Sequence, residues 1–247
     1  EGPIDPMLKT VTLAQDGKPI VRMHYYATHP QTFYREGRAS YDFPGMARQR
    51  LEEEEGVFQM YFTGCSGDVT AGKYNRGTPE DRAELADRLF AGMKASVAAT
   101  EYVPVDKIVW RSVPVQLSYR TKGRPDREAR LAVLRDPDAD PDARISAAGA
   151  LACMDRLVRP IDISSIQIGP ARILHLPGEP MIEFQHYAQR ILPEQFVAVA
   201  GYGLATPGYV CTEEAFTQGG YEPGASNVVP ESEKAVKGAI CEALGVE

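Results

Sequence analysis

The sequence Leu176-Pro177-Gly178-Glu179-Pro180 forms the turn on which the predicted fold depends. It separates an apolar, strand-like run at 171–176 from a run at 181–191 that has helical character. A carboxylate at such a turn sits at the end of a sheet, where open α/β folds place their chemistry. No lysine or arginine adjoins Glu179, so its charge needs a cation, a proton or a metal. Alternatively, Glu179 only starts the helix at Pro180, where a negative charge is favourable.

The composition is typical of a globular protein and excludes several classes. With 43% hydrophobic and 25% charged residues, the 247-residue chain can build a sizeable core, and we predict one domain over 1–247. The net charge of -7 and the absence of a basic cluster argue against a nucleic-acid partner. No apolar run approaches the ~18 residues of a membrane span, so no transmembrane segment is expected. The chain begins with neither an initiator Met nor a signal peptide, which suggests a mature product or a piece of a longer protein.

Alternating strand and helix patterns predict an α/β fold, with a mixed sheet and flanking helices. A hairpin across Asp16-Gly17 and strand–helix–strand units are both expected. We predict strands at 7–14, 19–28, 57–63 (buried), 107–120, 161–169, 171–176 and 196–201. We predict helices at 43–54 (capped by Asp42), from 78 through Met93, and at 127–134, 143–157, 181–191 and 231–244. The charged region 121–158 is interpreted as a helical excursion within the domain, and 202–226 as a loop.

Two of the four histidines lie close together in the sequence. His24 and His29 are five positions apart on one expected strand, so they should point to opposite faces. His29 ends that strand just before Pro30 and is the better candidate for a metal ligand. His175 precedes Glu179 on its strand, whereas His186 on the next helix is expected to be structural or exposed.

The small-residue loop at 64–72 has the composition of a binding site, although it could equally be a tight turn. Small residues let backbone approach a ligand, and successive N–H groups can hold an anion. Cys65, Ser66 and Thr70 are possible nucleophiles or proton carriers, but no GxSxG signature is present. A second loop, at 201–226, contains Tyr202, Tyr209 and Tyr221 among glycines and threonines. Loop tyrosines of this kind are usually packing or surface residues. The four cysteines are too far apart for a CxxC zinc motif or a dense disulfide framework.

Four blocks together resemble the neutral/alkaline, non-lysosomal ceramidases, a family of zinc amide hydrolases, and occur in that family's order. They cover about 200 residues, and each block alone is a weak signal. The spacing from Tyr209 to Tyr221 also matches the family pattern. The blocks are Tyr25-Tyr26-Ala27-Thr28-His29-Pro30, Gly67-Asp68-Val69-Thr70, Leu176-Pro177-Gly178-Glu179, and 208–226 with Gly208-Tyr209-Val210-Cys211-Thr212 and Gly219-Gly220-Tyr221.

The resemblance implies a zinc site and a catalytic apparatus. His29, Glu179 and Tyr209 would bind Zn²⁺, and their side-chain tips should then lie within ~4–5 Å of one another. Thr70 would stand beside the attacking water, and Tyr221 would donate to the developing oxyanion. Gly67, Asp68 and Tyr221 would contact the substrate, a ceramide or related lipid amide. Sphingolipid metabolism and a secreted or periplasmic location are expected from the family.

Two departures from the family pattern leave alternatives open. Thr70 stands where the family has serine, and Ala71-Gly72 replaces the usual Pro-Asn. The family's first zinc ligand, in a His-x-His block, has no counterpart here, so we expect it in a missing N-terminal part of the same catalytic domain. The alternatives are a related zinc hydrolase of another amide or ester, and a non-catalytic module with an incomplete metal site.

Overall fold

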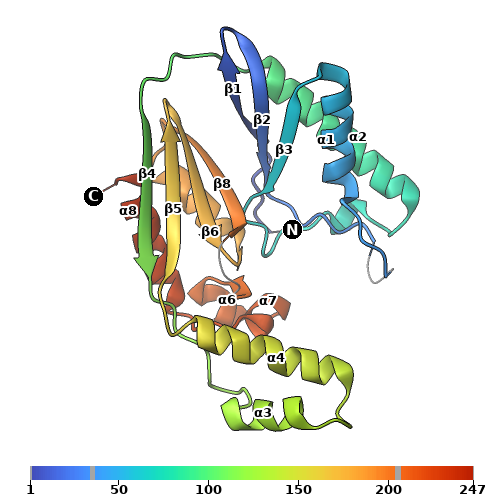
Figure 1. Cartoon of the computed structure of the whole chain (residues 1–247), viewed down its shortest axis with the longest axis vertical. Helices are drawn as coiled ribbons and strands as arrows, with labels where there is room; N and C mark the ends of the chain where they lie inside the picture. The colour runs from blue at the N-terminus through green and yellow to red at the C-terminus, as the bar shows by residue number, and fades with distance from the viewer. Residues whose placement is uncertain (1, 34–36, 204–206, 247) are drawn as a thin grey trace.

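The structure is a computed structural model that describes residues 2–33, 37–203 and 207–246. It is a mixed α/β fold, as predicted, arranged in four layers: helices, a small sheet, a larger sheet and helices again (Figure 1). The one mixed sheet expected from the sequence is therefore divided, in the described residues, into a three-stranded, a four-stranded and a two-stranded sheet. Within the same residues, no helix is both long and apolar enough to cross a bilayer.

The first sheet has the order β1-β2-β3, with β1 at Lys9–Gln15, β2 at Lys18–Tyr26 and β3 at Phe58–Thr63. The predicted β1–β2 hairpin is confirmed, and its turn residues Asp16 and Gly17 have φ values of 50° and 75°. β3 then pairs in parallel with β2. The prediction of a buried strand here is wrong, because β3 is an edge strand whose Phe58 is 56% exposed.

Two helices cover the outer face of this sheet, α1 at Asp42–Glu55 and α2 at Pro79–Ala98. Thr78 caps α2 by accepting a hydrogen bond from the Asp81 backbone N–H, as its sequence predicts. Asp42, in contrast, is the first residue of α1 rather than its cap. The two helices share an apolar cluster that consists of Phe43, Ala47, Leu51, Leu85, Ala86, Leu89 and Met93.

The second sheet has the order β4-β5-β6-β8. The hairpin predicted between β5 and β6 is confirmed as an antiparallel pair, and β6 pairs in parallel with β8. Its strands are β4 (Ile108–Val115), β5 (Ile161–Ile168), β6 (Ala171–Pro177) and β8 (Phe196–Gly203). Alternate side chains of these strands therefore enter two different cores.

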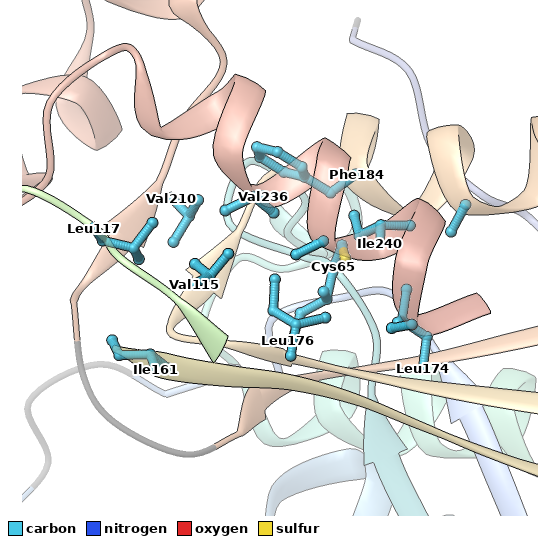
Figure 2. Close-up of a cluster of buried hydrophobic side chains, with 14 of the residues drawn as sticks. Cys65, Val115, Leu117, Ile161, Leu174, Leu176, Phe184, Val210, Val236 and Ile240 are labelled. Carbon is cyan, nitrogen blue, oxygen red and sulfur yellow. The ribbon is translucent and has the colours of Figure 1, made fainter. Parts of the chain in front are cut away.

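One core lies between the two sheets, and the other lies beneath helices α5 (Ile182–Arg190) and α8 (Ser232–Leu244). Adjacent residues of β6 illustrate the division, since Ile173 faces the first sheet whereas Leu174 faces the helices. Figure 2 shows Leu174, Leu176 and Phe184 in the helix-side core. These side chains are at most 2% exposed, so each contributes about 1.5–3 kcal/mol of burial free energy.

The remaining elements lie at one end of the second sheet (Figure 1). Helices α3 (Arg127–Arg135) and α4 (Pro141–Arg156) pack on each other and confirm the two helices predicted there. The prediction of a loop at 202–226 is only partly correct, because this stretch also forms short elements; its positions 204–206 lie outside the described residues. These elements are β9 (Tyr209–Val210), α6 (Glu213–Gln218) and α7 (Tyr221–Ala225).

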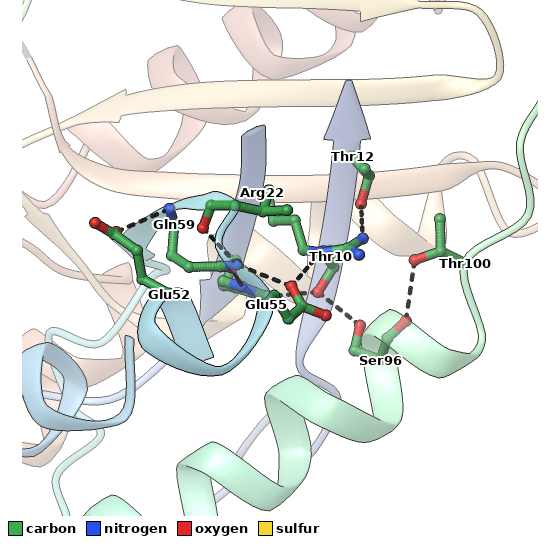
Figure 3. Close-up of polar contacts among 10 residues, drawn as sticks. Thr10, Thr12, Arg22, Glu52, Glu55, Gln59, Ser96 and Thr100 are labelled. Atoms are coloured by element: carbon green, nitrogen blue, oxygen red, sulfur yellow. Dashed lines mark hydrogen bonds and ion pairs between the residues drawn. The ribbon is translucent and has the colours of Figure 1, made fainter. Parts of the chain in front are cut away.

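A buried polar network joins the first sheet to its helices (Figure 3). His24 belongs to this network: its Nδ1 lies 2.8 Å from Thr10 Oγ1 and its Nε2 lies 2.8 Å from Gln59 Oε1. Burial lowers the pKa of His24, so the ring is kept neutral. His24 is thus a structural residue on the helix-facing side of β2, whereas His29 lies beyond the end of that strand and not on it as predicted.

Candidate metal centre

Four strands end at one edge of the two-sheet core. The chain leaves β2 toward His29, β3 toward the loop at 64–70, and β6 toward Glu179, while Tyr202 lies at the end of β8. β2 and β3 run parallel, as do β6 and β8, and all four point the same way in Figure 1. The carboxyl ends of parallel strands are the usual position of binding sites in open α/β folds.

His29 is held in place by the loop that follows β3. Its backbone N–H donates to Val69 O at 2.9 Å, and it forms a parallel bridge with Thr70. Its ring Nδ1 also lies 3.2 Å from Val69 O. Because a carbonyl oxygen can only accept, Nδ1 carries a hydrogen and the neutral ring presents its lone pair at Nε2. Metal-binding histidines are commonly fixed by such a bond at the other ring nitrogen.

Glu179 is brought beside Tyr209 by backbone pairing. Gly178 makes the turn at a φ of 64°, which is accessible to glycine at little cost. The next two residues form β7 (Glu179–Pro180), which pairs in parallel with β9 so that Glu179 stands opposite Tyr209. Glu179 N–H donates to Gly208 O at 2.9 Å. The helix-start interpretation of Glu179 is wrong in detail, because α5 begins at Ile182 after an N-cap at Met181.

The side chains of His29 and Glu179 meet directly, with Nε2 3.2 Å from Oε2. The ring of Tyr209 lies next to them, with its centroid 6.5 Å from that of His29. Tyr221 stands edge-on to Tyr209 at 5.8 Å and is 69% exposed. The residues that the sequence placed in one site are therefore neighbours, although 150 positions separate His29 from Glu179.

The electrostatics of the pair favour a positive charge between the two side chains. Burial alone would lower the pKa of His29, but its contacts with Glu179 and Val69 raise it above the ordinary value. Burial and the nearby Glu179 carboxylate also raise the pKa of Tyr209, so this phenol keeps its proton while no cation is bound. A lone pair on Nε2 and a carboxylate oxygen repel each other unless a proton or a metal ion lies between them.

The donor set fits a metal ion only if tyrosine is included. In residues 2–33, 37–203 and 207–246, no three His, Cys, Asp or Glu side chains gather as metal ligands would. His29 and Glu179 provide one nitrogen and one carboxylate, and the adjacent Tyr209 can add a phenol oxygen. Nitrogen and oxygen donors of this kind suit zinc.

The loop after β3 packs closely against β7. Gly67 N–H donates to Pro180 O at 2.9 Å, and a Cβ at Gly67 would lie only 2.7 Å from Glu179 O. The Oδ1 of Asp68 accepts from the Ile182 N–H at 2.7 Å and so secures the start of α5. In this structure both residues therefore position the backbone around Glu179, while the hydroxyl-bearing Thr70 is exposed beside His29.

A buried amide network supports this loop from behind. The Gln185 side chain accepts the Cys65 N–H at Oε1 (3.0 Å) and donates to Asp5 Oδ2 at 2.7 Å. Asp5, only 5% exposed, also accepts from Gln189 at 2.8 Å and from the Met7 N–H. Asp5 therefore fixes the orientation of the Gln185 amide, which in turn positions the backbone of the loop.

We expect Asp5→Asn to destabilise the protein by about 1–3 kcal/mol at neutral pH, because the new amide would face the donor groups of Gln185 and Gln189. Burial opposes ionisation of Asp5, but its hydrogen bonds lower its folded-state pKa below the ordinary value. The carboxylate therefore stabilises the fold above the pKa of the unfolded chain, and this contribution is lost as the pH falls through the folded-state value. Urea unfolding at several pH values measures both effects. A difference between the two proteins that stayed constant into acid would contradict this role of the charge.

Two functional candidates were not distinguished by their sequence. Tyr202 was one of several loop tyrosines, yet its hydroxyl lies 2.9 Å from His29 Nε2 and 3.0 Å from Ser66 Oγ. Ser66 is fully buried and so less accessible than a nucleophile requires. The available signal for Tyr202 was its position at the end of a buried strand, next to Gly201.

The chain resembles solved ceramidase structures in its fold. One, described as a ceramidase complexed with C2, has a TM-score of 0.71 and 14% identity over 98% of this chain. Another, the neutral ceramidase from Pseudomonas aeruginosa, has a TM-score of 0.70 and 16% identity over 98% of this chain. The chain spans about half of each, 49% and 47% respectively. No protein family and no curated protein sequence matches the chain. At these identities the likeness establishes the fold alone.

Proposed function

We propose that this chain is part of a zinc-dependent amide hydrolase that cleaves the N-acyl bond of ceramide or a related lipid amide. The observation that carries the proposal is the pair of His29 Nε2 and Glu179 Oε2, 3.2 Å apart at the ends of parallel strands. The fold shared with two ceramidases and the four sequence blocks support the same reaction.

His29, Glu179 and Tyr209 would hold the zinc ion, and the sequence resemblance places a further histidine in the part of the protein outside this chain. When bound, Zn²⁺ polarises a carbonyl and lowers the pKa of a water to about 7. The Val69 carbonyl keeps the His29 ring oriented with Nε2 toward Glu179. The phenol of Tyr209 has to lose its proton on binding, since the ordinary pKa of tyrosine is ~10.

The two other proposed catalytic residues, Thr70 and Tyr221, are both exposed. Thr70 is exposed and its backbone bridges to that of His29, which supports the proposal that its hydroxyl would orient an attacking water. Its methyl group restricts χ1 and narrows the space that a serine would leave. Tyr221 is exposed beside Tyr209 and would donate to the oxyanion, a contribution of about 3 kcal/mol.

The substrate would approach over the loop after β3. Asp68 uses Oδ1 for the Ile182 N–H, so a substrate hydroxyl would meet its other oxygen. The Gly67 N–H already donates to Pro180 O, so it would not bond to the substrate. Gly67 would instead make room for the substrate because it has no side chain. A secreted or periplasmic location, where lipid amides in outer membrane surfaces are accessible, remains an expectation from the family resemblance.

The full-length natural protein is expected to contain about one zinc ion and to hydrolyse an N-acyl sphingoid amide, and chelation should abolish this activity. Metal analysis and product release, compared with a short-chain amide and a matched ester, provide the measurements. Undiminished hydrolysis after complete removal of metal would refute the mechanism. Hydrolysis of the ester alone would instead indicate a related hydrolase of another bond, and a folded protein without metal or activity would indicate a non-catalytic module.

A further inference from the structure

We propose that the hydroxyl of Tyr202 is an additional ligand of the cation held by His29 and Glu179. This inference rests on the proposed metal centre and goes beyond it. It adds one further ligand from this chain to the set of His29, Glu179 and Tyr209 proposed above.

Two oxygen atoms lie close to His29 Nε2, near the separation of ligands that share one small cation. Tyr202 Oη lies 2.9 Å from Nε2, and Glu179 Oε2 lies 3.2 Å from it. Ligands bound at ~2.0–2.1 Å in tetrahedral geometry are separated from each other by about 3.3 Å. Both oxygens therefore lie close to the same nitrogen, and the three residues come from different parts of the chain: His29 follows β2, Glu179 follows β6, and Tyr202 lies at the end of β8.

In a protonated His29 ring, Nε2–H can donate to Glu179 Oε2, whereas in the neutral ring that proton is absent and a cation can take its place. With Nδ1–H directed at Val69 O, the neutral ring can accept the phenol proton of Tyr202 at Nε2. The carboxylate oxygen of Glu179 then faces the same nitrogen at 3.2 Å with no hydrogen between them. A cation at this point is attracted to the nitrogen, the carboxylate and the phenol oxygen together.

The backbone fixes Tyr202 at this position. Tyr202 has a φ of 59°, a conformation that costs a residue with a side chain about 1–2 kcal/mol. Its N–H donates to Gly178 O at 2.8 Å, so it is tied to the residue immediately before Glu179. Its ring meets that of His29 edge-on, with centroids 5.8 Å apart.

Ser66 provides the outer partner that a ligating oxygen usually has. Its Oγ is 3.0 Å from the Tyr202 hydroxyl, and the residue is completely buried. The serine hydroxyl can donate to a phenolate oxygen and stabilise its negative charge. Outer-shell hydrogen bonds of this type typically change metal affinity about 10- to 100-fold.

The test uses the 247-residue chain titrated with Zn²⁺ or Co²⁺ alone. Affinity is measured by competition with a chelating dye, and ionised phenols are counted from the ultraviolet difference spectrum of tyrosinate. The unmodified chain should ionise both Tyr202 and Tyr209 for each cation bound. Tyr202→Phe should ionise one phenol fewer and bind at least about tenfold more weakly. Ser66→Ala should weaken zinc binding but leave the number of ionised phenols unchanged. The control is Tyr102→Phe, in the exposed segment before β4, which should change neither the affinity nor the number of ionised phenols.

The outcomes separate this inference from the function on which it rests. A Tyr202→Phe variant with an unchanged phenol count, or with tighter binding, would overturn Tyr202 as a ligand while the metal centre stands. Tighter binding would mean that Tyr202 competes with the cation for Nε2. If the unmodified chain bound neither ion, the donor set of this chain would be insufficient, and the inference would fail. Zinc bound by the full-length protein would in that case keep the proposed function intact.

Discussion

Glu179→Gln is expected to reduce zinc affinity by more than about 100-fold and to abolish hydrolysis by the full-length protein. Glutamine has nearly the same shape as glutamate but lacks its charge, and it keeps an amide group facing His29 Nε2 at the 3.2 Å position. The backbone pairing of Glu179 with Tyr209 does not depend on the side chain, so the fold should persist. Zinc content, dye competition and hydrolysis of an N-acyl sphingoid amide measure the three consequences.

Glu101→Gln is the matched control, because Glu101 lies in the exposed segment before β4. This variant should match the unsubstituted protein in zinc affinity and in the rate of hydrolysis. The metal hypothesis would be untenable if Glu179→Gln retained full zinc affinity with a normal circular dichroism spectrum. Retained zinc with lost hydrolysis would instead restrict Glu179 to a role in the reaction itself.

Gly178→Ala is expected to destabilise the protein by about 2–5 kcal/mol and to weaken metal binding with it. A Cβ at this position would lie 2.5 Å from Gly208 O and 2.8 Å from Pro207 Cγ, at a backbone φ of 64°. Relief of these clashes requires β7 and β9 to separate, which moves Glu179 away from Tyr209. Denaturant unfolding gives the stability, and dye competition gives the zinc affinity.

Gly149→Ala provides the comparison, since a Cβ on this residue of α4 meets nothing within 4 Å. Alanine is the better helix former, so this variant should be neutral or up to about 1 kcal/mol more stable. If Gly178→Ala matched Gly149→Ala in stability and zinc affinity, the close approach of β7 to β9 would not be what positions Glu179 beside Tyr209.

Local signals in the sequence were sufficient for most of the elements. The Asp16-Gly17 hairpin and the Thr78 cap of α2 depend on residues only a few positions apart, and both are present. Such features follow from backbone conformation and hydrogen bonds within one turn. The division into separate sheets did not follow, because strand periodicity does not specify which strands pair.

In the candidate site too, the residue types could be predicted from the sequence, but their arrangement in space could not. His29, Glu179 and Tyr209 were candidates because their blocks resemble a family, and their proximity in space follows from the parallel pairing of β2 with β3 and of β7 with β9. The exposed edge position of β3 and the short helices near Tyr221 could not be read from residue patterns, because both depend on packing against distant segments.

By itself, the sequence determined the α/β class, the local elements and the residue types able to hold a metal. Only the tertiary structure decided that Tyr202, 173 positions from His29, reaches the same ring nitrogen and that Ser66 stands behind it. The physical reason is that helices, hairpins and caps are stabilised within a few residues. A binding site, in contrast, is formed where strand ends meet, and that meeting is fixed by burial of side chains from the whole chain.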